Sequence, residues 1–214
     1  MNIKTERYQE HLKRLPETGQ HILGHQSEDH IVVYQAYKKS IADFALANQI
    51  LGGNDFSYSR MSWIKPNFLW MMYRCGWAEK QNQERVLALW IKKSDFNEIL
   101  GKAVFSSFDK SHYGSHEQWK QELNFSDVRL QWDPDHDPYG NKMQRRAIQL
   151  GMKGETLENF GKNQIQLIED ITEFVKSQKQ SLDGDQLGKL YVPIETVFND
   201  FNAGVVERIG VNRC

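Results

Sequence analysis

The stretch IVVYQAY at residues 31–37, followed by SIADFALANQI at residues 40–50, gives the first indication of the fold. A dense run of β-branched and aromatic residues predicts a β-strand. Ser40 is a residue type that caps helices, so a helix is expected over residues 41–50, and Gly52 and Gly53 end it. A strand that leads directly into a helix indicates a fold that mixes both elements.

The remaining chain continues this mixture without an internal repeat or a low-complexity linker. We therefore predict an α+β fold, with one domain over residues 31–214 and an N-terminal extension at residues 1–30. The central sheet is expected to be mixed or antiparallel and flanked by helices. The expected elements are a helix at 5–15, an extended piece at 61–65, a helix at 66–75, a strand at 85–91, a helix at 94–105, a short helix around Trp119, strands at 127–132 and 146–150 joined by a loop at 133–140, a short helix at 155–160, an extended run at 164–171, a helix at 172–182 and an apolar pattern at 192–201.

Composition is that of an ordinary globular protein. The 214 residues are 39% hydrophobic and 26% charged, and 27 Lys plus Arg nearly balance 28 Asp plus Glu. The longest apolar runs, residues 68–73 and 86–91, hold six residues each, whereas a membrane span needs about 20. The charged N-terminus does not resemble a secretory signal, and two cysteines fit a reducing compartment. We expect a cytoplasmic protein that does not enter the membrane.

Aromatic and basic residues are concentrated in RMSWIKPNFLWMMYRCGW at residues 60–77. Between Arg60 and Lys93 there are seven basic residues and two acidic ones. Cations bind phosphate and aromatic rings stack on bases, so this pattern is typical of a nucleotide or nucleic-acid site. The alternative is a buried helix with an aromatic stripe beside a solvated basic face.

Two glutamines are expected on neighbouring strands of the predicted hairpin. Alternation places Arg129 and Gln131 on one face of their strand, and Gln149 points the same way as Ala147 on the partner strand. Such a pair is suited to reading a ring amide or a base edge. The alternative is a polar sheet surface with cross-strand hydrogen bonds.

Other motifs argue against several common chemistries. Asp133, Asp135 and Asp137 resemble the start of a calcium loop but lack its glycine and glutamate, so a solvated turn is favoured. Two histidine pairs have no third ligand, and no metal site is expected. Cys75 lies in an apolar helix and reads as a buried structural thiol. The P-loop, Rossmann and nucleophile-elbow motifs are absent.

Five segments closely resemble a family catalogued as domain of unknown function 4291. The resemblance covers about residues 31–175 and brings no established activity. The segments are VYQAY (33–37), RMSWIKPNFLWMMYRCGWA (60–78), QERVLAL (83–89), VRLQWDPDHD (128–137) and RRAIQLGM (145–152).

The order of elements is also similar, more loosely, to the ADP-ribosyltransferase fold, notably the toxin branch that modifies nucleic acid. This resemblance implies NAD as substrate, with the first strand and the aromatic block around it. Gln149 falls where that fold carries a catalytic glutamate, and Glu195 is the other candidate for that role. The implied cofactor-binding residues are Tyr34, Gln35, Tyr37, Arg60, Trp63, Lys65, Trp70 and Arg74, and the implied catalytic residues are Gln149 and Tyr73.

Two functional hypotheses follow. In the first, the protein cleaves nicotinamide from NAD and passes ADP-ribose to a nucleic-acid or protein acceptor. In the second, the basic aromatic surface binds RNA or single-stranded DNA without chemistry and uses Trp63, Trp70 or Trp77 for stacking. A glutamine cannot act as a base or supply a negative charge, so Gln149 is the weakest point of the first hypothesis.

Overall fold

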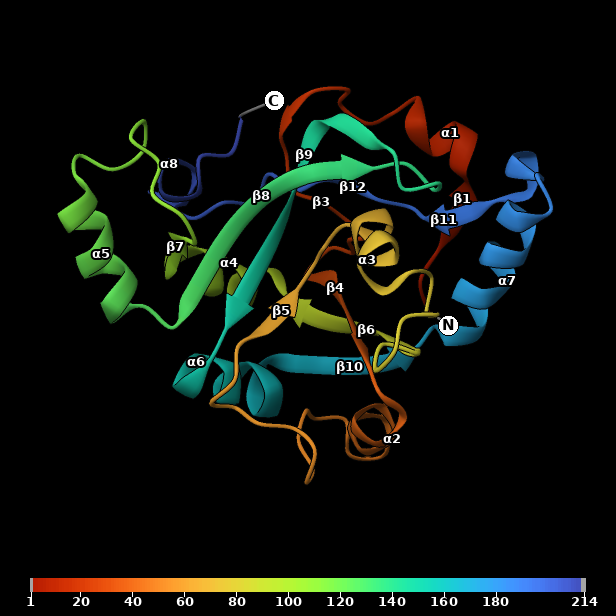
Figure 1. Ribbon diagram of the computed structural model, residues 1–214, viewed down its shortest axis with the longest axis horizontal. Helices are drawn as coiled ribbons and strands as arrows, with labels where there is room; N and C mark the ends of the chain where they lie inside the picture. Colours follow the sequence, from red (N-terminus) through yellow and green to blue (C-terminus); the bar gives the residue numbers. More distant parts are fainter. Residues whose placement is uncertain (1, 213–214) are drawn as a thin grey trace.

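The computed structural model describes residues 2–212, and its helices and strands alternate along the chain (Figure 1). The elements are β1 (Thr5–Arg7), α1 (Tyr8–Leu12), β2 (Gly19–Gln20), β3 (Leu23–Gly24), β4 (His30–Tyr37), α2 (Lys39–Asn48), β5 (Ser62–Ile64), α3 (Phe68–Cys75), β6 (Arg85–Lys92), α4 (Lys93–Gly101), β7 (Ala103–Phe105), α5 (His116–Phe125), β8 (Val128–His136), β9 (Lys142–Met152), α6 (Gly154–Asn159), the π-helix η1 (Phe160–Gln164), β10 (Ile165–Asp170), α7 (Thr172–Asp183), the 3₁₀-helix η2 (Leu187–Lys189), β11 (Tyr191–Pro193), β12 (Thr196–Val197) and α8 (Val205–Ile209).

The strand predicted at residues 31–37 is β4, and it lies at one side of a three-stranded antiparallel sheet in the order β10-β6-β4. Val33 is in register with Leu89, which is in turn in register with Ile168. The helix predicted after β4 is α2. Its cap is Lys38, however, and Ser40 lies inside the helix, where its hydroxyl donates to Asp55 at 2.6 Å.

A second sheet is mixed, in the order β2-β9-β8-β7, and β5 also pairs with β9. The β8–β9 hairpin is antiparallel, whereas β7 and β2 run parallel to their neighbours. A backbone bridge between Tyr34 and Lys65 connects the two sheets, and β8 bends strongly across the front of β9 (Figure 1). The predicted α+β fold with a mixed and antiparallel sheet is therefore confirmed.

Alternation along the strands divides the apolar residues between two cores. Val33 and Leu89 belong to the larger core, which α2, α4, α6 and α8 help to enclose. Val32 and Ala88 point the other way, into a smaller core under α3 and α7. Helices α5 and α8 lie at one end of the molecule and α1 and α7 at the other (Figure 1). No helix within residues 2–212 is long and apolar enough to cross a membrane.

The first 24 residues pair with distant parts of the chain. β1 pairs with β11, β2 with β9 and β3 with β12. The helix predicted at 5–15 is wrong in part, because residues 5–7 form β1 and the helix is limited to α1. The backbone groups of residues 5–7 pair with β11, so they are not available for the hydrogen bonds of a longer helix.

Two other sequence predictions are wrong in part. The helix expected to reach residue 105 ends at Gly101, and Ala103–Phe105 forms β7 because it finds a parallel partner in β8. The loop expected at 133–140 begins later, since β8 continues to His136. The carboxylates of Asp133 and Asp135, which were expected to be solvated in this loop, instead accept hydrogen bonds from side chains on β8 and β9.

Candidate functional site

The centre of the candidate site is a carboxylate held by two amides. Gln131 on β8 and Gln149 on β9 are register partners. Each donates its side-chain amide to one oxygen of Asp133, at 2.8 Å from Gln131 and 2.7 Å from Gln149. Among residues 2–212, Asp133 forms no ion pair, so its negative charge is fixed in position but not neutralised by direct contact with a cation.

We call the side of β8 and β9 that carries these three residues the glutamine face. It lies opposite the larger core, because Leu130 and Ile148 on the same strands point into that core. Gln149 is only 8% exposed, while Gln131 and Asp133 are half-buried. The face is therefore sheltered, and a ligand reaches the carboxylate from the side of Gln131 and Asp133.

An aromatic side chain from β5 forms one border of the glutamine face. Trp63 is in register with Gly151, two residues beyond Gln149 on β9. A Cβ atom at position 151 would lie 2.8 Å from Cε2 of the Trp63 ring, so the ring rests directly on the glycine backbone. Only glycine permits this close approach. The half-buried Trp63 ring therefore lies beside the Asp133 carboxylate and its two amide donors.

A buried lysine comes directly after the end of β5. Lys65 is 6% exposed, and its Nζ donates to the carbonyl of Trp63 at 3.2 Å. Burial, together with the nearby charge of Arg74, lowers the pKa of Lys65 to about 7, while Cys75 and Asp133 oppose the shift. An arriving anion favours the charged form of this lysine.

Three rings, two from α3 and one from the end of β8, stack on one another. The Tyr73 ring lies on the His136 imidazole with centroids 3.6 Å apart and planes 10° apart, and Trp70 is 5.2 Å from His136. Tyr73 is 43% exposed, whereas Trp70 and His136 are buried. Burial lowers the pKa of His136, while Asp135 opposes this shift and the Pro134 carbonyl also opposes it. The imidazole is therefore neutral near pH 7.

Polar atoms of this stack lack normal hydrogen bonds. Within the described chain, Nε1 of Trp70 and both ring nitrogens of His136 are buried with no partner of good geometry. Buried polar groups are nearly always satisfied by protein, water or ligand. The stack is thus a place where a water molecule or a ligand group is expected to bind.

Two of the predicted residues on the first strand lie on the other side of the sheet. The Gln35 amide donates to Oγ of Ser62 at 2.8 Å, and the Tyr37 hydroxyl donates to Oε1 of Gln35 at 2.8 Å. Burial raises the pKa of Tyr37, and Ser62 opposes the shift. Tyr34 is fully buried in the smaller core. The structure therefore does not bring these three side chains together with Gln149.

The cations of the basic block are dispersed. Arg85 pairs with Asp43 at 3.0 Å and also with Asp170, and Lys93 pairs with Asp200 at 2.7 Å. Arg60 and Arg74 are exposed. Lys65, Tyr73 and Arg60 do not share a hollow: Lys65 is buried, Arg60 stands in solvent, and Tyr73 lines a hollow of about 340 Å³ with Trp77 and Tyr139.

Two carboxyl groups, those of Asp135 and Glu195, are buried in the interior. Asp135 accepts from Nε of Arg145 at 2.5 Å, and both side chains are almost fully buried. Glu195 accepts from the backbone of Phe68 at 2.6 Å at the start of α3. Burial raises the pKa of Glu195 to about 8, the Phe68 N–H lowers it, and Asp135 raises it. Glu195 is therefore a buried group that anchors α3.

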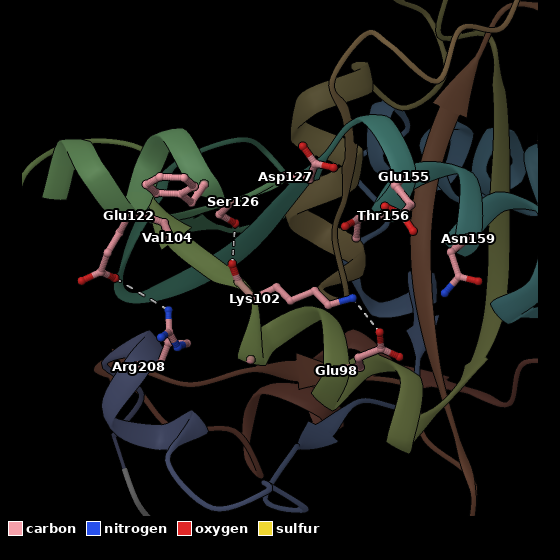
Figure 2. Close-up of a pocket in the computed structure, with 12 residues that line it drawn as sticks. Glu98, Lys102, Val104, Glu122, Ser126, Asp127, Glu155, Thr156, Asn159 and Arg208 are labelled. Carbon is pink, nitrogen blue, oxygen red and sulfur yellow. Dashed lines mark hydrogen bonds and ion pairs between the residues drawn. The ribbon is translucent and has the colours of Figure 1, made fainter.

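A hollow of about 650 Å³ lies between α4, α5, α6 and α8. Figure 2 shows Lys102 extended toward Glu98 and Arg208 facing Glu122, at 2.6 and 3.8 Å. None of the predicted site residues lines it. Its charged groups mainly pair with one another, so it offers less defined chemistry than the glutamine face.

The sequence singled out Gln131, Gln149, Trp63 and Lys65 as candidates but did not single out Asp133, which accepts from both glutamines. Asp133, Asp135 and Asp137 were predicted to form a solvated turn, because the sequence Asp-Pro-Asp-His-Asp is typical of turns. The signal that was available is periodicity: polar residues continue at every second position from residue 129 to 135, as on one face of a longer strand.

The fold and the site together define an α+β protein with a clamped carboxylate on an amide-rich sheet face. A profile of the family described as Domain of unknown function (DUF4291) matches residues 21–198, and the chain belongs to this family. A search among curated proteins finds no match.

Proposed function

We infer that the glutamine face binds NAD and that the protein cleaves its nicotinamide–ribose bond and transfers ADP-ribose to an acceptor. The observation that carries this proposal is the Asp133 carboxylate, which the amides of Gln131 and Gln149 hold in place. It supplies the negative charge that a glutamine at position 149 cannot supply. In this proposal Asp133, on the neighbouring strand, takes the place of the catalytic glutamate that the ADP-ribosyltransferase fold carries at the position of Gln149.

Cleavage of NAD requires stabilisation of positive charge on the ribose. The bond between the ribose C1 atom and the nicotinamide nitrogen breaks, and its electron pair leaves with nicotinamide. The oxocarbenium-like ribose is stabilised by a fixed carboxylate, here Asp133, whose geometry is set before the reaction. The acceptor then attacks C1 and releases its proton to solvent. The amide oxygens of Gln131 and Gln149 are available to accept from ribose hydroxyls.

The borders of the face match the remaining parts of a dinucleotide. Trp63 and Tyr73 offer ring surfaces for the nicotinamide and the base. Lys65, with a pKa of about 7, gains charge when a phosphate approaches, and Arg74 is a neighbouring exposed cation. These roles assign binding to residues that the sequence already indicated.

The alternative function, a nucleic-acid binding module without chemistry, has less support. Trp70 and Trp77 are only 4% and 7% exposed, and the cations Arg85 and Lys93 are paired with carboxylates. A module of this kind needs exposed rings and unpaired cations on one surface.

The test is release of nicotinamide from NAD, measured with and without RNA or DNA. We expect turnover by the wild-type protein and a loss of about hundredfold or more in Asp133→Asn, the scale seen when preorganised electrostatic stabilisation is removed. Asp29→Asn, which alters an exposed aspartate elsewhere, is the matched control and should keep the wild-type rate. Equal rates in Asp133→Asn and the wild type, or no release in any condition, would contradict the proposal.

A further inference from the structure

The hollow that Tyr73 lines is built by three segments of the chain. The end of α3, the loop between β8 and β9 and the end of α7 meet around a volume of about 340 Å³. Ligand sites usually enclose about 300–1,000 Å³. The side chains that give this hollow its chemistry are Tyr73, Trp77, Tyr139, Asp137, Lys179 and Asp183.

Two exposed tyrosine rings line this hollow. Tyr73 is 43% and Tyr139 is 52% exposed, and both are among the few large hydrophobic side chains of residues 2–212 that are not covered. The Tyr73 ring is held by its stack on His136. Nε1 of Trp77 donates to the carbonyl of Pro138 at 3.2 Å, which ties the loop to the end of α3. The rings therefore stand on a fixed frame and offer their faces to a ligand.

The charged side chains of the hollow leave an excess of negative charge. Asp137 accepts from the backbone N–H groups of Tyr139 and Asn141 and from the Asn141 amide, each at 2.9 Å. These donors are neutral, and within residues 2–212 Asp137 forms no ion pair. Asp183 is paired with Lys179, one turn earlier on α7. Two carboxylates and one ammonium group leave the lining with a formal charge of −1.

Two helix ends add to this negative charge. Gly76, which caps the C-terminus of α3, and Asp183, the last residue of α7, both line the hollow. The C-terminal end of a helix carries a partial negative charge. The carbonyls of Met72, Pro138 and Leu182 already accept hydrogen bonds from N–H groups of the chain. The hollow thus attracts a cation but offers it few free hydrogen-bond acceptors.

We propose that this hollow binds a quaternary ammonium group, such as that of choline or of a trimethylated lysine side chain. Aromatic ring faces attract cations, and quaternary ammonium groups are commonly bound in this way. Such a group has no N–H that needs an acceptor, and its methyl groups pack on Tyr73, Tyr139 and Leu182. A guanidinium has five N–H donors and would leave most of them unpaired here. Tyr139 and Lys179 have no part in the site proposed for NAD, so the two proposals are tested separately.

The binding test uses tetramethylammonium, whose methyl protons are followed by NMR at constant ionic strength in sodium chloride. Tyr139→Leu is expected to weaken binding about threefold to fivefold, the range for loss of one cation–π contact, whereas Tyr139→Phe should keep the wild-type affinity. Phe125→Leu removes an exposed ring elsewhere and is the matched control. Lys179→Gln should strengthen binding about twofold or more, because it leaves the charge of Asp183 unpaired.

The opposite signs of these effects make the inference easy to overturn. Equal affinity in Tyr139→Leu and the wild type, weaker binding in Lys179→Gln, or no binding of tetramethylammonium to the wild type would each contradict it. Tighter binding of N-acetyl-arginine amide than of tetramethylammonium would assign the hollow to a guanidinium and would also contradict it. Competition by choline and by a trimethyllysine peptide, with the unmethylated peptide as control, then identifies the source of the group, and preference for either of the two supports the inference.

Discussion

Asp133 and Asp135 stand two residues apart on β8, and the regular pairing of β8 with β9 is interrupted at Asp135. Asp133 is half-buried and is held by two neutral amides. Asp135 is fully buried and is held by the guanidinium of Arg145. A second nitrogen of Arg145 donates to the carbonyl of Pro16 at 3.2 Å, so the N-terminal segment closes this buried region.

The difference separates a carboxylate that is neutralised in the interior from the one that we propose acts in the reaction. A guanidinium neutralises the charge that it binds, and removing either partner leaves an unpaired charge in the interior. Amides fix the position of a carboxylate but leave its charge available. We therefore assign stability to the region around Asp135 and Arg145 and chemistry to the glutamine face.

The largest expected effect is on stability. Asp135→Ala leaves Arg145 buried without its counter-ion, which costs about 3–5 kcal/mol in the free energy of unfolding. Denaturant unfolding measures this difference. Asp133→Asn is the comparison from the other region and should cost less than about 1 kcal/mol, because it leaves no buried unpaired charge. Similar losses in the two variants would remove the distinction between the regions.

The buried region is also expected to make stability depend on pH. Burial raises the pKa of Glu195 from 4.5 to about 8, so between these values the folded protein keeps a proton that the unfolded chain releases. The stability contributed by this group is complete at low pH and falls as the pH rises. Between pH 5 and pH 7 the wild type should lose about 2–3 kcal/mol relative to Glu195→Gln. Unfolding curves at the two pH values measure the difference, and parallel behaviour of the two proteins would contradict it.

A smaller effect is expected on turnover when one amide of the clamp is removed. In Gln149→Leu the carboxylate of Asp133 keeps a single amide donor, so kcat for nicotinamide release should fall about tenfold, or about 1.4 kcal/mol, with little change in KM. Gln81→Leu replaces an exposed glutamine and serves as the control. A rise in KM at constant kcat would show instead that Gln149 only contributes to binding.

The smallest effect concerns the ring at the border of the glutamine face. Trp63→Leu removes the indole that rests on Gly151, and loss of a stacking surface worth about 1 kcal/mol should raise KM for NAD about fivefold. Steady-state kinetics over a range of NAD concentrations checks this. An unchanged KM would place the dinucleotide away from this border.

Much of the fold was predictable because its strands and helices carry local signals. The β-branched run at 31–37 and the alternation at 127–132 both became strands, and the helix expected at 172–182 is α7. Residues 103–105 were assigned to a helix because their partner, β8, lies more than 20 positions further along the chain. Local patterns do not reveal such distant pairing.

The site was predictable only in part, for the same reason. The sequence placed Gln131 and Gln149 on neighbouring strands, and the structure shows that they are register partners. The identity of their shared partner depended on whether β8 continued past Trp132, and the composition of residues 133–137 favoured a turn. The excess of positive charge in the basic block did not become a patch, because carboxylates from α2 and from residues 170 and 200 neutralise Arg85 and Lys93.

The most direct test of the central claim is a crystal structure of Asp133→Asn soaked with NAD, since this variant should bind the dinucleotide without consuming it. We predict that the nicotinamide ribose lies within hydrogen-bonding distance of Gln131 or Gln149 and beside residue 133, with a ring of the ligand against Trp63 or Tyr73. Binding of NAD in another hollow, or an unoccupied glutamine face at saturating NAD, would contradict the account.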